Sequence, residues 1–276
     1  MSGLLVFPDI DPVAFQIGPI VIRWYALAYL AGLLGGWQIL RRMAPAWPHL
    51  GALKRDDIDD FLVWATVGVV VGGRIGYVLF YKPAFFAANP AEILQVWHGG
   101  MSFHGGLLGV VLATWFYTRW RRVPLLPFAD CVAVVAPLGL LFGRLANFIN
   151  GELFGRPSSV PWAMVFPGGG VEPRHPSQLY QATLEGALLL AVMLIVSRRA
   201  TFRNRPGLAM GLFLGLYGVA RIAAEFFREP DPFLGFIWQG ATMGQMLSLP
   251  MIAVGAGLAA FAAVGRTAPS AARPMP

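Results

Sequence analysis

One stretch decides the fold class: FADCVAVVAPLGLLFGRLANFI, residues Phe128–Ile149. Its apolar length matches the roughly 20 residues that a helix needs to cross the hydrocarbon core of a bilayer. Arg144 lies inside it, although a guanidinium keeps its proton and costs about 3 kcal/mol at mid-membrane even on the mildest scales. The stretch therefore predicts a membrane helix whose arginine needs an anionic partner or water.

Composition places the whole chain in the same class. Hydrophobic residues make up 57% of the 276 residues, charged residues make up 13%, and the mean hydropathy is +0.61. Soluble domains carry roughly 25% charged residues, so we predict an integral membrane protein. The net charge of +7 does not indicate nucleic-acid binding. The basic residues cluster at the ends of apolar runs, where membrane topology accounts for them.

Seven windows of membrane-spanning length follow one another and predict an all-α integral membrane fold. They are Gly18 to Leu40, Asp60 to Tyr81, Gly99 to Thr118, Phe128 to Ile149, Gln178 to Ser197, Leu208 to Phe227 and Met243 to Val264. We expect a single membrane domain, residues 1–276, because the sequence has no internal repeat and no long polar linker. A flexible C-terminal tail is expected at residues 267–276, which are rich in Ala and Pro.

The basic residues predict the orientation of these helices. Thirteen of them fall on one side, namely Arg41, Arg42, Lys54, Arg55, Arg119, Arg121, Arg122, Arg198, Arg199, Arg203, Arg205, Arg266 and Arg273. The opposite side has Lys82, Arg156, Arg174 and Arg228. The positive-inside rule then places the N-terminus outside and the C-terminus in the cytoplasm. The Gly- and Pro-rich connection over residues 150–176 becomes an extracytoplasmic cap.

Four arginines interrupt the apolar windows: Arg23, Arg74, Arg144 and Arg221. Four such charges would cost about 12 kcal/mol at mid-membrane if they met neither anions nor water. Few carboxylates lie inside the windows to pair with them. We therefore predict that a lipid phosphate supplies the missing negative charge.

One polar stripe runs along the sixth window. Tyr217, Arg221, Glu225 and Arg228 recur at intervals of four, four and three residues, so they share one face of a helix. The stripe is either an inward face on which Glu225 fixes the arginines for an anionic ligand, or a structural ion pair that holds helices together. The spacing alone decides for neither interpretation.

A second stripe ends the fourth window. Arg144, Asn147 and Asn150 lie at helical spacing, and Glu152 and Gly155 follow them closely. A helix cap would explain one asparagine or one glycine, but not an arginine, two amides and a carboxylate framed by glycines. We therefore favour a ligand-binding site at this end of the helix.

Histidines mark the start of the third window, where His98 and His104 lie among four glycines. Imidazole titrates near neutral pH, so His104 is a candidate for proton transfer, with helix–helix hydrogen bonding as the alternative. The two are six residues apart, and only His49 and His175 remain, so we expect no zinc site. The single cysteine, Cys131, lies in an apolar run and is interpreted as a buried hydrophobic residue.

Three further groups are weaker signals. Arg74 precedes Tyr77 and Tyr81 at helical spacing, and Tyr25 stands beside Arg23. The fifth window carries Gln178, Gln181 and Glu185 on one face. Tyrosines near the ends of membrane helices are more often interface anchors than catalytic residues.

Several segments resemble one enzyme family, the bacterial prolipoprotein diacylglyceryl transferases. The signature is GRLANFINGELFG, residues Gly143–Gly155. Other family-like segments, in the family's order, are Gly72–Tyr77, Ser102–Gly106, Arg174–Tyr180 and Arg221–Pro230. The match covers nearly the whole chain, and the topology predicted from charge agrees with the family fold.

The resemblance implies a transfer of the diacylglyceryl group from phosphatidylglycerol to the lipobox cysteine of a preprolipoprotein signal peptide. This reaction forms a thioether and releases glycerol phosphate in the bacterial cytoplasmic (inner) membrane, where the enzyme is a multi-pass protein. The resemblance implies no metal and no cofactor, because arginines can stabilise the departing phosphate. The nucleophile is then the substrate's own cysteine.

The site residues follow as a hypothesis from this resemblance. Arg144 and Arg221 bind the lipid phosphate, and His104 takes or relays the thiol proton. The substrate-binding candidates are Asn147 and Asn150 for the head group, Glu152 and Glu225 to orient arginines, Tyr25 and Tyr217 to line the cavity, and Arg74 and Gly155. Arg23 and Arg74 are equally open to structural roles or to guiding lipid entry.

Two other classes of function fit the arginines less well. A transporter or flippase for an anionic lipid predicts internal repeats with paired broken helices, which the sequence lacks. An intramembrane protease needs a serine with a histidine, or two aspartates. Ser102 and His104 are the only serine–histidine candidates, and residues two apart on a helix point in different directions.

Overall fold

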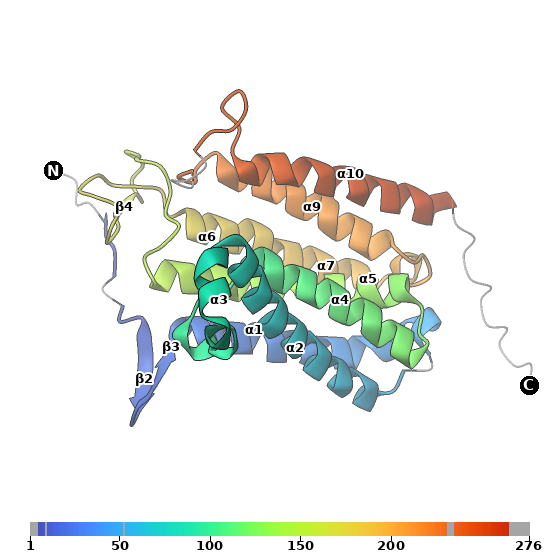
Figure 1. Ribbon diagram of the computed structural model, residues 1–276. Coiled ribbons are helices and arrows are strands. Elements are labelled where there is room, and N and C mark those ends of the chain that lie inside the picture. The colour runs from blue at the N-terminus through green and yellow to red at the C-terminus, as the bar shows by residue number, and fades with distance from the viewer. Residues whose placement is uncertain (1–4, 9, 52, 231–234, 265–276) are drawn as a thin grey trace, which may run out of the picture. The chain divides into compact units, whose positions relative to one another are not determined.

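The computed structural model describes residues 5–8, 10–51, 53–230 and 235–264, and helices make up most of them (Figure 1). The longer helices are α1 (Trp24–Met43), α2 (Arg55–Phe80), α4 (Phe103–Arg121), α5 (Leu125–Ile149), α9 (Leu208–Glu225) and α10 (Met243–Val264). Another long helix combines α6 (Ser177–Gln181), the π-helical turn η5 (Ala182–Leu188) and α7 (Leu189–Ser197). The expected tail at residues 267–276 lies outside the described residues.

The remaining elements are short. They comprise α3 (Pro83–Ala88), α8 (Ala200–Arg203), the 3-10 turns η1 (Ala44–Ala46), η2 (Pro48–Leu50), η3 (Pro90–Leu94) and η4 (Val96–His98), and the strands β1 (Leu5–Val6), β2 (Val13–Ile17), β3 (Ile20–Arg23) and β4 (Met164–Val165). The chain divides into two compact units, Met1–Ile39 with Asp130–Pro276, and Leu40–Ala129.

Each of the seven apolar windows overlaps a long helix. Five of these helices are long and apolar enough to cross a membrane: α2, α5, the combined helix Ser177–Ser197, α9 and α10. Helices α1 and α4 contain several aromatic residues and glycines, which lower their hydropathy. The mostly helical membrane class is thus confirmed. The count of seven spans, the orientation and the single domain stay predictions.

The first window differs from the structure at its start. Strands β2 and β3 form an antiparallel hairpin in which Ile17 pairs with Ile20, and Gly18 takes a positive φ of 57° in the tight turn. The β-branched residues of β3 favour a strand as well as a hydrophobic environment, so hydropathy alone placed the helix too early. Helix α1 begins at Trp24. Arg23 is consequently an exposed residue at the end of β3, and the prediction that it lies inside a membrane helix is wrong.

In the unit Leu40–Ala129, glycines bring α2 and α4 into backbone contact. A Cβ atom added to Gly68 would lie 2.6 Å from the carbonyl oxygen of Gly109, and one added to Gly76 would lie 2.8 Å from the Cα atom of Gly105. Small residues four apart allow membrane helices to approach this closely. Gly105, next to His104, therefore serves helix packing.

In the other unit, α9 and α10 lie side by side (Figure 1), and a Cβ atom added to Gly211 would lie 2.7 Å from the carbonyl oxygen of Gly255. The segment predicted as a cap is folded onto the same unit. Its strand β4 pairs in parallel with β1. The ring of Phe7 lies 5.2 Å from those of both Phe148 and Phe166, which ties the N-terminal strand, the end of α5 and the cap together.

Candidate functional site

The centre of the candidate site is a chain of charges that alternate in sign: Arg144 on α5, Glu185 in η5, Arg221 and Glu225 on α9, and Arg228 just after it. Nε and Nη2 of Arg144 donate to Oε2 of Glu185 at 3.2 and 3.0 Å. Nη1 of Arg221 donates to the other oxygen, Oε1, at 3.4 Å. One carboxylate thus joins two arginines from different helices.

Glu225 continues the chain on α9. Its Oε1 lies 2.6 Å from Nη2 of Arg221 and 3.1 Å from Nη1 of Arg228, as expected for residues four and three apart on one helix face. Thr242, just before α10, donates its hydroxyl to Oε2 of Glu225 at 2.5 Å. Glu225 thus contacts two arginines of the predicted stripe, and its role in orienting them for a ligand stays a prediction.

These contacts correct the expectation that few carboxylates are available to the arginines. Glu185 and Glu225 neutralise two of the three guanidinium groups in the cluster, which leaves one net positive charge. Buried ion pairs of this kind offset the cost of desolvating each charge only when their geometry is good. The arginines therefore have protein partners. The one net positive charge that remains on the cluster would attract a further anion.

The side chains of the cluster differ in access. Arg144 and Arg221 keep 16% and 11% of their side-chain surface exposed, whereas Glu185 keeps none. A guanidinium has five N–H donors, so its contacts with a carboxylate do not exhaust its capacity to bind a ligand. Both arginines thus retain some exposed surface, and the carboxylate between them retains none.

The amides at the end of α5 form a second group. Nδ2 of Asn147 donates to Oε1 of Glu152 at 2.8 Å, and Nδ2 of Asn150 donates to the same oxygen at 3.3 Å. The backbone carbonyl of Glu152 accepts from Nε2 of Gln178 on α6 at 2.6 Å. Glu152 thus orients two asparagines, whereas the sequence suggested that it orients an arginine.

Two tyrosines lie within electrostatic reach of the cluster. Tyr217 lies one turn before Arg221 on α9 and interacts with the charges of Arg144 and Glu185 as well. Tyr25, at the start of α1, interacts with the charges of Arg144 and Glu152, and its hydroxyl lies 3.4 Å from that of Tyr29. Both positions suit the predicted lining of a binding site beside Arg144.

Gly155 has a structural explanation. Its backbone N–H donates to the carbonyl of His175 at 2.8 Å, and an added Cβ atom would lie 2.6 Å from the Cβ of His175. A larger residue would therefore push the strand-like segment of the cap away from His175. This contact accounts for the glycine in the signature without contact to a ligand.

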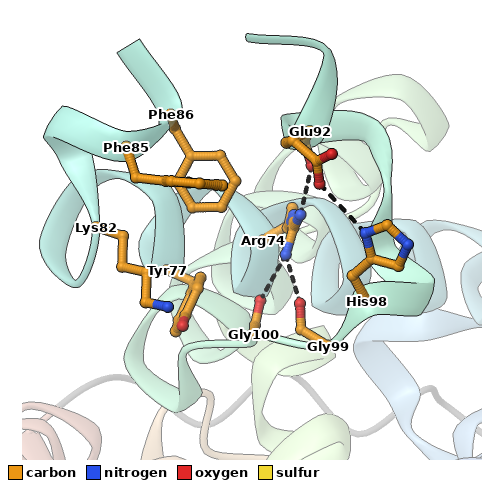
Figure 2. A pocket seen from close by; sticks show the side chains of 9 residues that line it. All are labelled: Arg74, Tyr77, Lys82, Phe85, Phe86, Glu92, His98, Gly99 and Gly100. Atoms are coloured by element: carbon orange, nitrogen blue, oxygen red, sulfur yellow. Dashed lines mark hydrogen bonds and ion pairs between the residues drawn. The ribbon is translucent and has the colours of Figure 1, made fainter. Parts of the chain in front are cut away.

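Arg74 is enclosed by backbone in the unit Leu40–Ala129 (Figure 2). Its five N–H donors point to the carbonyl oxygens of Glu92, Ile93, Gln95, Gly99 and Gly100, at distances of 2.5 to 3.2 Å. The guanidinium carbon also lies 5.0 Å from the centre of the Phe86 ring, and only 5% of the residue is exposed. This arrangement uses every donor of Arg74 to shape the loop between α3 and α4, which favours a structural role.

A pocket of about 260 Å³ lies beside Arg74, with Lys82 and Phe85 on one side and Glu92 and His98 on the other (Figure 2). Nδ1 of His98 lies 3.2 Å from Oε2 of Glu92, so this imidazole has a carboxylate partner. Among the described residues, no group of His, Cys, Asp and Glu is arranged to hold a metal ion.

His104 lies in the first turn of α4, and its side chain is exposed. Ser102 is buried and caps the same helix, because its hydroxyl oxygen accepts from the backbone N–H of Gly105 at 3.2 Å. This cap explains Ser102 without a protease function. The role of His104 in proton transfer stays a prediction.

Comparison with known proteins identifies the family. The model of the family described as "Prolipoprotein diacylglyceryl transferase" matches residues 12–261. The chain belongs to this family.

Relatives with the name phosphatidylglycerol–prolipoprotein diacylglyceryl transferase align over nearly the full length. The protein of Paramagnetospirillum magneticum is 56% identical over 263 residues, which cover 95% of this chain and 97% of the relative. The protein of Rhodospirillum rubrum is 57% identical over 276 residues, with 98% of each chain covered. The protein of Gluconacetobacter diazotrophicus is 56% identical over 264 residues, with 95% and 94% covered.

Among the candidates proposed for a transferase site, the structure brings together Arg144, Arg221, Glu225 and the two tyrosines, and it places Asn147 and Asn150 around Glu152. Glu185 is the residue that the site hypothesis missed. Its only signal in the sequence was its place on a polar face of the fifth window.

Proposed function

We propose that this membrane enzyme transfers the diacylglyceryl group of phosphatidylglycerol to the lipobox cysteine of a preprolipoprotein, the first step of lipoprotein maturation. Membership of the family and the names of its full-length relatives support the reaction. The observation that carries the site is the pairing of Arg144 and Arg221 on one carboxylate in a cluster with one net positive charge.

The chemistry calls for such a charge. The cysteine thiol loses its proton, and its sulfur forms a bond to the phosphate-bearing carbon of the diacylated glycerol. The bond from that carbon to the phosphate oxygen breaks. The electron pair leaves with that oxygen, so the phosphate passes from one negative charge to two. Guanidinium donors placed in advance around the phosphate stabilise the second charge as it develops.

The residues take the following roles in this proposal. Arg144 and Arg221 bind the phosphate, whose single charge in phosphatidylglycerol matches the single excess charge of the cluster. Asn147 and Asn150, held by Glu152, bind the hydroxyl groups of the head group, and Tyr25 and Tyr217 line the site. His104 takes the thiol proton. Arg74 and Gly155, which the sequence placed among the substrate-binding residues, are given structural roles because of their contacts.

The membrane arrangement is part of the same proposal. Seven helices cross the cytoplasmic membrane with the N-terminus outside, and residues 150–176 form an extracytoplasmic cap over the end of α5. This topology puts the end of α5 that carries Asn147 and Asn150 on the side where a secreted protein emerges. The lipid head group and the lipobox cysteine then meet on one side of the membrane.

A reconstitution experiment tests the reaction. Purified protein is incubated with a lipobox peptide and either phosphatidylglycerol or the zwitterionic phosphatidylethanolamine, and the peptide is analysed by mass spectrometry. We expect the peptide to gain a diacylglyceryl thioether with phosphatidylglycerol but not with phosphatidylethanolamine. No thioether should form when the lipobox cysteine is replaced by alanine. Release of glycerol phosphate is measured in the same samples. Lipid moved across vesicles without any peptide product would support a transporter instead.

A further inference from the structure

Glu185 occupies a singular place in the cluster, because it touches both arginines assigned to the phosphate. One of its oxygens accepts from Arg144 at 3.0 and 3.2 Å, and the other accepts from Arg221 at 3.4 Å. Glu225, by contrast, pairs with Arg221 and Arg228, which are three or four residues away from it on the same segment of chain. Glu185 alone among these contacts connects α5 to α9.

The backbone around Glu185 is unusual in a way that fits this placement. Residues Ala182–Leu188 form a π-helical turn inside an otherwise α-helical segment, and Glu185 lies at its middle. Such turns are rare, widen the helix and occur frequently at functional sites. The turn also contacts α5, because a Cβ atom added to Gly186 would lie 2.7 Å from the Cα atom of Leu141. Leu141 precedes Arg144 by one helical turn, so this contact sets Glu185 against the guanidinium of Arg144.

A buried carboxylate beside a phosphate site needs a reason. Facing the lipid directly, Glu185 would repel the phosphate, but its side chain has no exposed surface, whereas both arginines keep some. It therefore acts on the lipid through the arginines. Because each of its two oxygens holds a different guanidinium, their separation and orientation are both fixed by this one side chain.

We propose that Glu185 is a positioning residue of the transferase site, which holds Arg144 and Arg221 in the arrangement that stabilises the departing phosphate. This inference rests on the proposed function. It adds that the arginines act as a pair whose geometry is set by a carboxylate from a third segment of chain. A simple ion pair that only stabilises the fold is the competing explanation, and it predicts different kinetics.

The variant Glu185→Gln separates the two explanations. An amide has one acceptor oxygen and one NH₂ donor group, so it cannot accept from both arginines, and its NH₂ group faces one guanidinium donor to donor. The cluster also gains one net positive charge, which favours binding of the anionic lipid. We expect kcat to fall by about 100-fold, the effect of misplacing catalytic groups by roughly 1 Å. The KM for phosphatidylglycerol should stay unchanged or fall.

A second variant covers the case in which Glu185→Gln does not fold. Glu185→Asp keeps the charge but withdraws the carboxylate by one methylene group, so it reaches one arginine better than two. We expect a kcat that is more than about threefold below the wild-type value but above that of Glu185→Gln, again without a rise in KM. Both values are measured per folded molecule, on protein that elutes as a single peak in size-exclusion chromatography.

Asp130→Asn is the matched control. Asp130 is also a fully buried carboxylate in the same compact unit, but it accepts from the backbone N–H groups of Gly207 and Met210 at 2.6 and 2.7 Å, away from the arginines. We expect this variant to melt at a lower temperature with kcat unchanged. Thr183→Val, an exposed position of the same π-helical turn, should change neither.

The outcomes are distinct. A kcat for folded Glu185→Gln or Glu185→Asp within about threefold of the wild-type value would overturn the positioning role, as would a loss of activity that merely follows the loss of folded protein. A wild-type protein without transfer from phosphatidylglycerol would overturn the proposed function itself. The wild-type arm of the experiment therefore tells the two failures apart.

Discussion

Replacement of Arg221 by alanine gives the sharpest test of the arginine pair, because the structure lets the fold survive it. Arg221 contacts Glu185 at 3.4 Å and Glu225 at 2.6 Å. When it is removed, Glu185 keeps Arg144 and Glu225 keeps Arg228 as partners. Neither carboxylate is left as an unpaired buried charge, the situation that costs about 3–5 kcal/mol. The variant should therefore remain folded.

Its activity should nevertheless collapse. Loss of one donor that stabilises charge in a transition state costs roughly 10²–10³ in kcat, about 3–4 kcal/mol. Arg221→Ala loses a donor and also lowers the charge of the cluster from one positive to zero. We expect kcat/KM to fall by at least about 10³-fold, with both a lower kcat and a higher KM for phosphatidylglycerol.

The assay is the formation of diacylglyceryl thioether on a lipobox peptide, followed over time by mass spectrometry at several lipid concentrations. Arg221→Lys is measured beside it and should recover little, because a point charge does not reproduce a planar fork that contacts two carboxylates. Arg42→Ala, at an exposed position in the last turn of α1, controls for the loss of a positive charge. If folded Arg221→Ala kept a kcat/KM within about threefold of wild type, the phosphate-binding role of Arg221 would be refuted.

Three further predictions concern other parts of the molecule. Arg74→Gln loses most of five hydrogen bonds to backbone carbonyls, so the melting temperature should fall by several degrees. Folded molecules of this variant should keep their kcat. An unchanged melting temperature would contradict the structural role of Arg74. Gly68→Ala should also lower the melting temperature, because its methyl group would lie 2.6 Å from the carbonyl oxygen of Gly109. Gly139→Ala is the control, because there is open space around its added Cβ atom and its melting temperature should not fall. His104→Gln should slow the transfer; a normal rate would exclude His104 as the base.

Features that depend on local sequence were predictable. Hydropathy located the seven long helices of the described residues, because each overlaps an apolar window, and five of them are long and apolar enough to cross a membrane. The pairing of Arg221 with Glu225 followed from their spacing of four residues on one helix. The hairpin before α1 was missed because Ile20, Val21 and Ile22 suit a strand and an apolar helix alike.

Features that depend on tertiary contacts were not predictable in the same way. The spacing of Gln178, Gln181 and Glu185 shows a polar face, but it does not reveal which helix that face meets, so the contact of Glu185 with Arg144 and Arg221 stayed hidden. The same holds for Arg74. Its partners are backbone carbonyls, which every residue carries and which leave no mark in the sequence.

A structure of the protein with bound phosphatidylglycerol, or with a non-hydrolysable phosphonate analogue, tests the central claim most directly. The account predicts that Arg144 and Arg221 both donate to oxygens of one lipid phosphate, at about 2.7–2.9 Å, while Glu185 stays between them. A phosphate bound elsewhere, with both guanidinium groups in contact with protein carboxylates alone, would contradict it.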